Sequence, residues 1–333
     1  MSTPSMAWPE SERPHLAGVP AWLTAALATR APVTGPVETL WVKAWGVTAL
    51  FRADDDLVVF KDASPSLFPH AAGVYRLINR VVPRSAPALL AHEDFAGHSW
   101  SVFEYVAGPT VKQDGSLRAV VAMAEQLAYV QAEVLADGSM AGLPGYDVAT
   151  LPDELDVDIA DQPDEVRRDF GRLLPSFRRW ASDLSAFVPR SLDHPDMNLT
   201  NAIVPAGGGM VLLDWEEAAV GCPLFSLDRL TDEDFLRGRP ADEVAGAYLD
   251  ALGWNGRGDL RQAYELSRRL VPLRRAVEAR AYARALRRAD PHTRLTGLLI
   301  AQALRRSATA RLPVTVPPGS VGRTHGSAHS AIS

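Results

Sequence analysis

The sequence is poor in cysteine, in long apolar runs and in excess positive charge. Cys222, the one cysteine in 333 residues, cannot form an internal disulfide, so the fold needs no oxidising compartment and we expect a cytoplasmic protein. No run of about 18 apolar residues and no basic-then-apolar N-terminal segment is present, so we expect no membrane partner. The net charge of −6 argues against nucleic acid as a partner and mildly favours a cationic small molecule.

The composition is that of a folded globular chain. Hydrophobic residues make up 47% and charged residues 22%, and the 24 glycines and 25 prolines are too few for a disordered or fibrous protein. At roughly 150 residues per domain, the length predicts about two domains. Residues 313–333 are rich in serine, glycine, proline and histidine without an apolar period, and we expect a flexible tail there.

Residues 37–107 are predicted to form a sheet lobe, preceded by an N-terminal extension with a short helix over 1–36. The runs ETLWVKA, TALFRA and LVVFKDA have the length and composition of strands. A helical segment, LFPHAAGVYRLINRVV, comes next, and PALLAH and SWSVFEYV follow it as two further strands. The pattern predicts a five-stranded antiparallel sheet with one helix inserted between the third and fourth strands.

Residues 108–312 are predicted to form a larger, mainly helical lobe, so that the fold class is α+β. The acidic stretch 153–165 is expected to be a loop before a helix over 166–188. The arginine-rich helix over 268–288 is expected to present a solvated face, because its arginines alternate with alanine and leucine. The strands NAIV and MVLLDW flank three consecutive glycines and predict a hairpin.

The residues around this hairpin are suited to phosphoryl transfer. The loop HPDMNLTN before it contains Asp196 and Asn201, and its second strand ends at Asp214. Phosphoryl transfer needs a carboxylate that accepts the proton of the acceptor hydroxyl, and oxygen ligands for Mg²⁺. The hairpin returns Asp214 alongside Asn201, so the three oxygen side chains are expected to converge. The alternative is that Asp196 and Asn201 only cap turns.

These segments resemble the aminoglycoside phosphotransferase family, small-molecule kinases with a protein-kinase-like two-lobed fold. HPDMNLTN is similar to the family's catalytic loop, and VLLDWEEA is similar to its metal-binding strand. The resemblance implies that Asp196 is the catalytic base and that Asn201 and Asp214 hold Mg²⁺. It also implies that Glu216 is a direct or indirect metal ligand and that His194 braces the loop.

The resemblance implies that the sheet lobe binds ATP. Lys61, at the end of LVVFKDA, corresponds to the strand lysine that reaches the α and β phosphates. Gly46 stands in the segment that would cover the phosphates, where a protein kinase has three glycines. The segment FEYVAG is similar to the hinge, which places Glu104, Tyr105 and Val106 beside the adenine. The alternatives are a surface lysine and an ordinary fifth strand.

The chain departs from the family pattern at three positions. The family's helix glutamate, which pairs with the lysine, should fall near His70 or Ala71, but no Asp or Glu occurs from position 63 to 92. Lys61 must then be held by another group, such as Asp214 or the phosphates. Pro195 stands where glycine is usual, and Ser226 stands where the family often has an aspartate.

The predicted function is therefore ATP-dependent transfer of the γ-phosphoryl group to a hydroxyl of a small molecule, either an antibiotic or a metabolite. A protein kinase is disfavoured, because the segment after Asp214 leaves no room for an activation loop. Two alternatives remain open. One is a catalytically weak or silent protein that binds nucleotide or ligand without transfer, and the other is transfer of a different part of the nucleotide, such as AMP.

Overall fold

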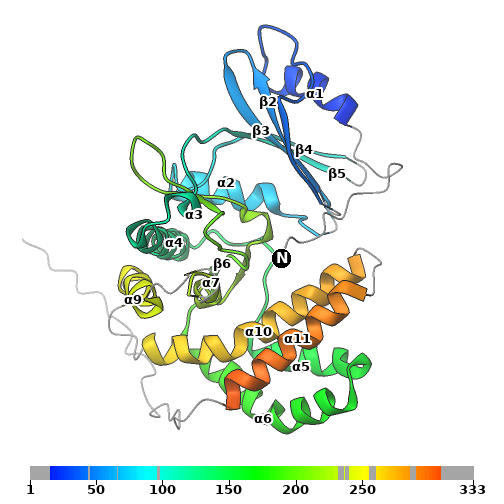
Figure 1. Cartoon of the computed structure of the whole chain (residues 1–333), viewed down its shortest axis with the longest axis vertical. Helices are drawn as coiled ribbons and strands as arrows, with labels where there is room; N and C mark the ends of the chain where they lie inside the picture. The colour runs from blue at the N-terminus through cyan, green and yellow to red at the C-terminus, as the bar shows by residue number, and fades with distance from the viewer. Residues whose placement is uncertain are drawn as a thin grey trace, which may run out of the picture.

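The protein consists of a sheet lobe above a helical lobe in the computed structural model (Figure 1). The structure describes residues 16–308, apart from 44–45, 66, 96–97, 232–235, 237–239, 255–259 and 286–289. The predicted tail over 313–333 and the first part of the N-terminal extension lie outside these residues. The predicted short helix of the extension is present as η2 (Leu16–Gly18) and α1 (Val19–Ala26).

The sheet lobe contains five antiparallel strands in the order β1-β2-β3-β5-β4. Their bounds are β1 Glu38–Lys43, β2 Gly46–Ala53, β3 Asp56–Ala63, β4 Leu89–Phe95 and β5 His98–Glu104. Helix α2 (Ala71–Val81) lies between β3 and β4 in the chain, as predicted. Burial alternates along the central strand β3, so Phe60 points into the lobe's core while Lys61 points to the other face.

Two hydrophobic cores divide the protein, and α2 does not belong to the sheet's own core. The sheet and α1 share a small core that includes Leu23, Phe51 and Phe60, with the two phenyl rings in edge contact at 5.9 Å. The buried face of α2, which includes Tyr75 and Ile78, packs instead into the large core of the helical lobe. Figure 1 shows α2 beneath the sheet, facing the helical lobe.

The helical lobe is built mainly from eight helices among the residues that the structure describes. They are α3 (Val111–Asp114), α4 (Leu117–Asp137), α5 (Leu151–Asp158), α6 (Asp164–Phe187), α7 (Leu224–Leu230), α9 (Ala241–Ala251), α10 (Leu260–Ala285) and α11 (Asp290–Ala308). The prediction of a loop over 153–165 is wrong, because this stretch forms most of α5 and the start of α6. Pro152 near the start of α5, followed by acidic residues in its first turn, favours a helix N-terminus.

The prediction of a solvated arginine face on α10 is also wrong. Arg269 is 7% exposed and Arg274 is 9% exposed. The Arg275 guanidinium lies 3.2 Å from the buried carboxylate of Asp228 on α7. Carboxylates of other elements face Arg274 and Arg275, and Arg269 lies over the Trp180 ring; a sequence pattern along one helix does not show those partners.

Helix α4 is, among the residues described, the one helix long and apolar enough to cross a membrane by length and composition. Half of its most apolar stretch is buried inside the protein, and Met123 and Leu127 on it are fully buried. The core helix of a globular protein has the same properties, so α4 is weak evidence for a membrane span.

Candidate active site

Two short antiparallel strand pairs position the loop over 194–201. Strand β6 (Ser191–Asp193) pairs with β9 (Ala219–Gly221) and ends directly before the loop. Strand β7 (Ala202–Ile203) begins directly after it and pairs with β8 (Val211–Leu212). The N–H of Leu213 donates to the carbonyl of Asn201 at 2.8 Å, so Asp214 lies beside Asn201 as the spacing predicted.

Asp214 has a backbone conformation that side chains rarely adopt. Its φ of 58° and ψ of 41° lie in the left-handed region. Such strain in a residue other than glycine persists only where the surrounding structure enforces it, and it concentrates at functional sites. The conformation turns the chain directly from β8 into the short helix η5 (Trp215–Glu217).

The Asp196 carboxylate is held by two neighbours and is still accessible. Its Oδ1 lies 3.1 Å from Nη2 of Arg229, and its Oδ2 accepts a hydrogen bond from the Asn198 amide at 3.1 Å. The side chain is 39% exposed. Sequence reasoning missed Arg229, because it comes from α7 and no spacing rule connects it with the loop. A carboxylate that is oriented and accessible can accept a proton from a bound hydroxyl.

Asn201 and Asp214 provide oxygen donors that fit Mg²⁺, whereas both oxygens of Glu216 already accept hydrogen bonds from Lys61 and Tyr75. The Asn201 amide nitrogen donates to the Asp196 carbonyl at 2.8 Å, which leaves its Oδ1 as the atom suited to a metal. Across the described part of the chain, no three or more His, Cys, Asp or Glu side chains form a metal site by themselves. Mg²⁺ is usually held by one or two carboxylates together with substrate phosphates, so this sparse donor set fits it.

Lys61 reaches across from the sheet lobe to this donor set. Its Nζ donates to Asp214 Oδ1 at 2.5 Å and to Glu216 Oε1 at 2.7 Å, and its side chain is 14% exposed. Burial opposes the lysine's charge, but the two carboxylates raise its pKa well above the usual value. Burial alone would raise the pKa of Asp214, and Lys61 lowers it instead. Both groups are therefore charged, and Lys61 is not a surface lysine.

Helix α2 contacts this ion pair through a tyrosine, since it has no acidic residue. The Tyr75 hydroxyl donates to Glu216 Oε2 at 3.2 Å and accepts the Trp215 N–H at 3.2 Å. Lys61 is thus held by Asp214, one of the groups expected, and also by Glu216, which was expected only as a metal ligand. The sequence feature that could have indicated a role for Tyr75 is its position on α2, the helix that lacks the family's glutamate.

Gly46 lines the same cleft as Lys61, Asp196 and Asp214. It pairs with Ala63, and a Cβ atom there would lie 2.4 Å from the Asp62 carbonyl oxygen. The close approach of β2 and β3 therefore requires glycine at this position, whether or not a phosphate binds beside it.

The hinge residues lie apart from this cleft, whose lining does not include Glu104 or Val106. The Glu104 carboxylate accepts the N–H of Ala88 at 2.9 Å, and the Glu104 N–H donates to the Ala88 carbonyl at 3.0 Å. The side chain and N–H of Glu104 are thus both bonded to the backbone of Ala88, just before β4. Its backbone carbonyl and the half-buried Val106 are left as the groups suited to an adenine.

A buried network braces the loop from below. His194 is buried, its Nε2 bonds the Leu213 carbonyl at 2.9 Å, and its N–H donates to Ser226 Oγ at 2.7 Å. Ser226 donates in turn to Asp193 Oδ1 at 3.1 Å, and Tyr146 donates to Asp193 Oδ2 at 2.7 Å. Burial raises the pKa of Asp193, although the nearby Arg274 opposes the shift. Ser226 thus connects the backbone of His194 to the buried Asp193.

One wall of the cleft is acidic and aromatic. Burial and the neighbouring Glu278 of α10 raise the pKa of Glu217 to about 8. Burial also raises the pKa of Tyr282, which shares a hydrogen bond with Glu217. The Tyr282 ring meets the Phe68 ring edge-on at 6.0 Å. Nothing in the sequence indicates Glu278 or Tyr282 as site residues, because α10 reaches the cleft only through the packing of the fold.

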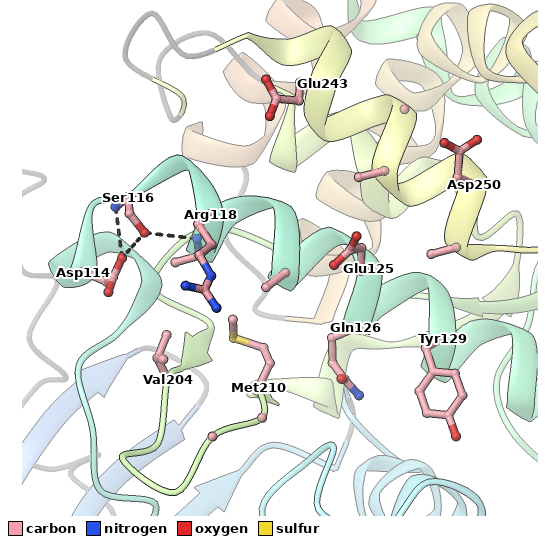
Figure 2. Close-up of a pocket in the computed structure, with 17 residues that line it drawn as sticks. Asp114, Ser116, Arg118, Glu125, Gln126, Tyr129, Val204, Met210, Glu243 and Asp250 are labelled. Carbon is pink, nitrogen blue, oxygen red and sulfur yellow. Dashed lines mark hydrogen bonds between the residues drawn. The ribbon is translucent and has the colours of Figure 1, made fainter.

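The cleft between the lobes is narrow. Its volume is about 40 Å³, and its lining includes Lys43, Gly46, Lys61, Phe68, Asp196, Asp214, Glu216 and Glu217. A wider groove of about 1310 Å³ lies elsewhere, between α4, α9 and the β7–β8 hairpin (Figure 2). Arg118, Glu125, Met210 and Asp250 line that groove, and none of the predicted site residues does. The candidate active site is therefore identified by the side chains in the narrow cleft, and not by the larger volume of the groove.

Comparison with known proteins agrees with this geometry. A model of the phosphotransferase enzyme family, APH, matches residues 45–266. No curated protein matches the sequence significantly. A choline/ethanolamine kinase family protein from Mesorhizobium loti has a similar structure, with a TM-score of 0.62, 17% identity, and coverage of 88% of this chain and 95% of that one.

Two antibiotic phosphotransferases are also similar in structure. Spectinomycin phosphotransferase APH(9)-Ia, in complex with ADP and spectinomycin, has a TM-score of 0.55 and 11% identity, with coverage of 88% of this chain and 97% of that one. A thermostable mutant of aminoglycoside phosphotransferase APH(4)-Ia, in complex with ADP and hygromycin B, has a TM-score of 0.58 and 17% identity, with coverage of 88% and 100%. At these identities the likeness shows a shared fold.

Proposed function

Because this chain belongs to the phosphotransferase enzyme family, we propose that it is a kinase that transfers the γ-phosphoryl group of ATP to a hydroxyl of a small molecule. The observation that carries the proposal is the meeting of Lys61, Asp196 and Asp214 in one cleft between the lobes. The family and fold are those of small-molecule kinases, and two of the similar structures contain ADP.

Each residue has a separate role in the proposed reaction. Asp196 accepts the proton of the attacking hydroxyl, and Asn201 and Asp214 hold Mg²⁺, which neutralises charge on the phosphates when it is bound. Lys61 binds the α and β phosphates, and the backbone of Glu104 and Val106 faces the adenine. The chain's contribution is mainly positioning and charge stabilisation.

The acceptor is proposed to contain a cationic nitrogen. Glu217 and Glu278 lie close enough to Asp196 for its charge to raise the pKa of both carboxyl groups. Burial and mutual repulsion oppose the charged forms of these carboxyl groups, so a bound cation would be stabilised as it restores their charge, and the adjacent rings of Tyr282 and Phe68 add faces that favour a cation. The solved structure of a choline/ethanolamine kinase family protein supports a small acceptor for this fold.

The test of the transfer reaction uses the whole chain with ATP, Mg²⁺ and a panel of hydroxyl compounds with and without an amine, analysed by mass spectrometry. We expect a gain of one phosphate on at least one amine-bearing compound. Asp196→Asn should still show a Mg²⁺-dependent thermal shift with ATP, but turnover should fall by about 10²–10⁴-fold, the usual contribution of a positioned base. A nucleotide-induced shift with no product from any compound, or an adenylated product, would contradict the proposal.

The test of the acceptor class is Glu278→Gln, with Glu265→Gln on the same helix as its control. Glu265 is half exposed and pairs with Arg268 on its own helix. We expect Glu278→Gln to raise KM for an amine-bearing acceptor by about tenfold, as expected for the loss of one charged contact. KM for a neutral acceptor should stay unchanged, and Glu265→Gln should change neither. Equal effects on both acceptors would overturn the cationic class while leaving phosphoryl transfer intact.

A further inference from the structure

We propose that Glu216 anchors Lys61 in place of an acidic residue on α2, and that Tyr75 is the positioning residue that holds Glu216 for this task. Helix α2 thus contacts Lys61 indirectly: Tyr75 of α2 bonds Glu216 of η5, and Glu216 bonds Lys61. The inference deepens the proposed function and rests on it, because it concerns the lysine assigned to the nucleotide phosphates.

The two oxygens of Glu216 have different partners. Oε1 accepts from Lys61 at 2.7 Å, and Oε2 accepts from the Tyr75 hydroxyl at 3.2 Å. The side chain of Glu216 is 18% exposed, so water competes little for either oxygen. A carboxylate that is bonded at both ends keeps one orientation, and the lysine that it binds is then fixed as well.

The hydrogen bonds of Tyr75 fix the direction of its phenol proton. The Trp215 N–H has only its own hydrogen to donate, so the Tyr75 oxygen is the acceptor of that bond at 3.2 Å. The phenol proton is then directed to Glu216.

The Tyr75 ring is itself immobilised by packing. It is 2% exposed, and its centroid lies 4.4 Å from that of Phe103. Its cluster is the core of the helical lobe, to which η5 also contributes Trp215. Tyr75 is therefore held between Phe103 of the sheet and the core that contains Trp215, so its hydroxyl has a fixed position beside Glu216.

The first test is Tyr75→Phe, which removes the hydroxyl and keeps the ring. We expect KM for ATP to rise by about tenfold, since a hydrogen bond to a charged group is lost, while KM for the acceptor stays unchanged. Tyr264→Phe is the matched control, because Tyr264 is 6% exposed and its hydroxyl bonds Thr231 at 2.9 Å, away from Lys61. A general packing effect would move both variants alike and would overturn the proposal.

A double-mutant cycle tests whether Tyr75 acts through Glu216. Glu216→Gln alone should raise KM for ATP more than Tyr75→Phe does. Adding Tyr75→Phe to Glu216→Gln should then change KM by less than twofold, because the partner of the hydroxyl is already altered. Additive effects of the two substitutions would mean that Tyr75 acts independently, and would overturn the proposed role.

A third measurement needs neither metal nor catalysis. Lys61 is labelled in EDTA with an amine-reactive reagent such as acetic anhydride, and the modified fraction is quantified by mass spectrometry. We expect Tyr75→Phe and Glu216→Gln to increase labelling at Lys61 severalfold, and Tyr264→Phe to leave it unchanged. Unchanged labelling in Tyr75→Phe overturns the anchor even in an active enzyme. Increased labelling supports it even if the wild-type protein transfers no phosphate.

Discussion

The two lobes hold their site residues in different ways. In the helical lobe, the loop that carries Asp196 is fixed from within the same lobe, through His194, Ser226 and the buried Asp193. In the sheet lobe, Lys61 extends from the central strand, and its partners Asp214 and Glu216 belong to the other lobe. The loop over 194–201 is therefore held by contacts within the helical lobe, whereas the position of the lysine depends on contact between the lobes.

Lys61→Met is expected to have the largest effect, because it removes the ion pair between Lys61 of the sheet lobe and Asp214 and Glu216 of the helical lobe. Phosphoryl transfer should fall by about 10²–10³-fold, in line with the loss of one preorganised donor at a reacting phosphate. Steady-state kinetics and a thermal-shift titration with ATP measure this. Circular dichroism should stay that of the wild type, since methionine keeps most of the side-chain volume. Wild-type turnover would show that the lysine is not part of the machinery.

Ser226→Ala tests the hydrogen bonds that hold the loop within the helical lobe, and it should have an intermediate effect. It leaves the buried His194 N–H without its acceptor, at a cost of about 1–3 kcal/mol in the free energy of unfolding. We expect kcat to fall severalfold with KM for ATP unchanged, because the disturbed loop carries the base and not the nucleotide site.

Ser267→Ala is the control for this substitution. Ser267 is 1% exposed, and its hydroxyl donates to the Tyr264 carbonyl within α10. Urea unfolding should show a loss of about 1 kcal/mol, with kcat unchanged. A rise in KM for ATP in Ser226→Ala, at constant kcat, would contradict the assignment of the network to the loop.

The smallest effect is expected at Cys222, which reports on the helical lobe alone. Its thiol is 2% exposed, and burial raises its pKa, so little thiolate is available to react. Alkylation by iodoacetamide should be slow in native buffer and fast in urea. Lys61→Met should leave the native rate unchanged, because the lobe folds without that contact. Faster labelling in this variant would mean that the lysine also stabilises the helical lobe.

Most of the sheet lobe could be predicted because its signals are local. Strand composition and the position of the inserted helix define the antiparallel sheet, and the structure confirms both. The hairpin is also a local signal, and it brings Asp214 to Asn201 as expected. These predictions depend on residues that are close in the chain, where turn chemistry and periodicity act directly.

The features that were predicted wrongly, or not predicted, depend on contacts between segments that are distant in the sequence. Arg229, Glu278 and Tyr282 reach the cleft only because α7 and α10 pack beneath the loop. The buried arginines of α10 were predicted to be solvated, since their pattern resembles that of an exposed helix until Asp193 and Asp228 are placed opposite them. The cytoplasmic location and the absence of nucleic-acid and membrane partners remain predictions.

The packing of α2 with the helical lobe has a mechanical consequence. The sheet and α1 share a small core, whereas α2 joins the large core of the helical lobe together with Phe103 of the sheet. The space beside the ion pair is about 40 Å³, and residues of both lobes enclose it. Lys61 belongs to the sheet, while Tyr75 belongs to α2, and Asp214 and Glu216 belong to the segment after β8. The ion pair therefore resists movement between the sheet and the helical lobe, because any such movement lengthens the bonds from Lys61 to Asp214 and Glu216.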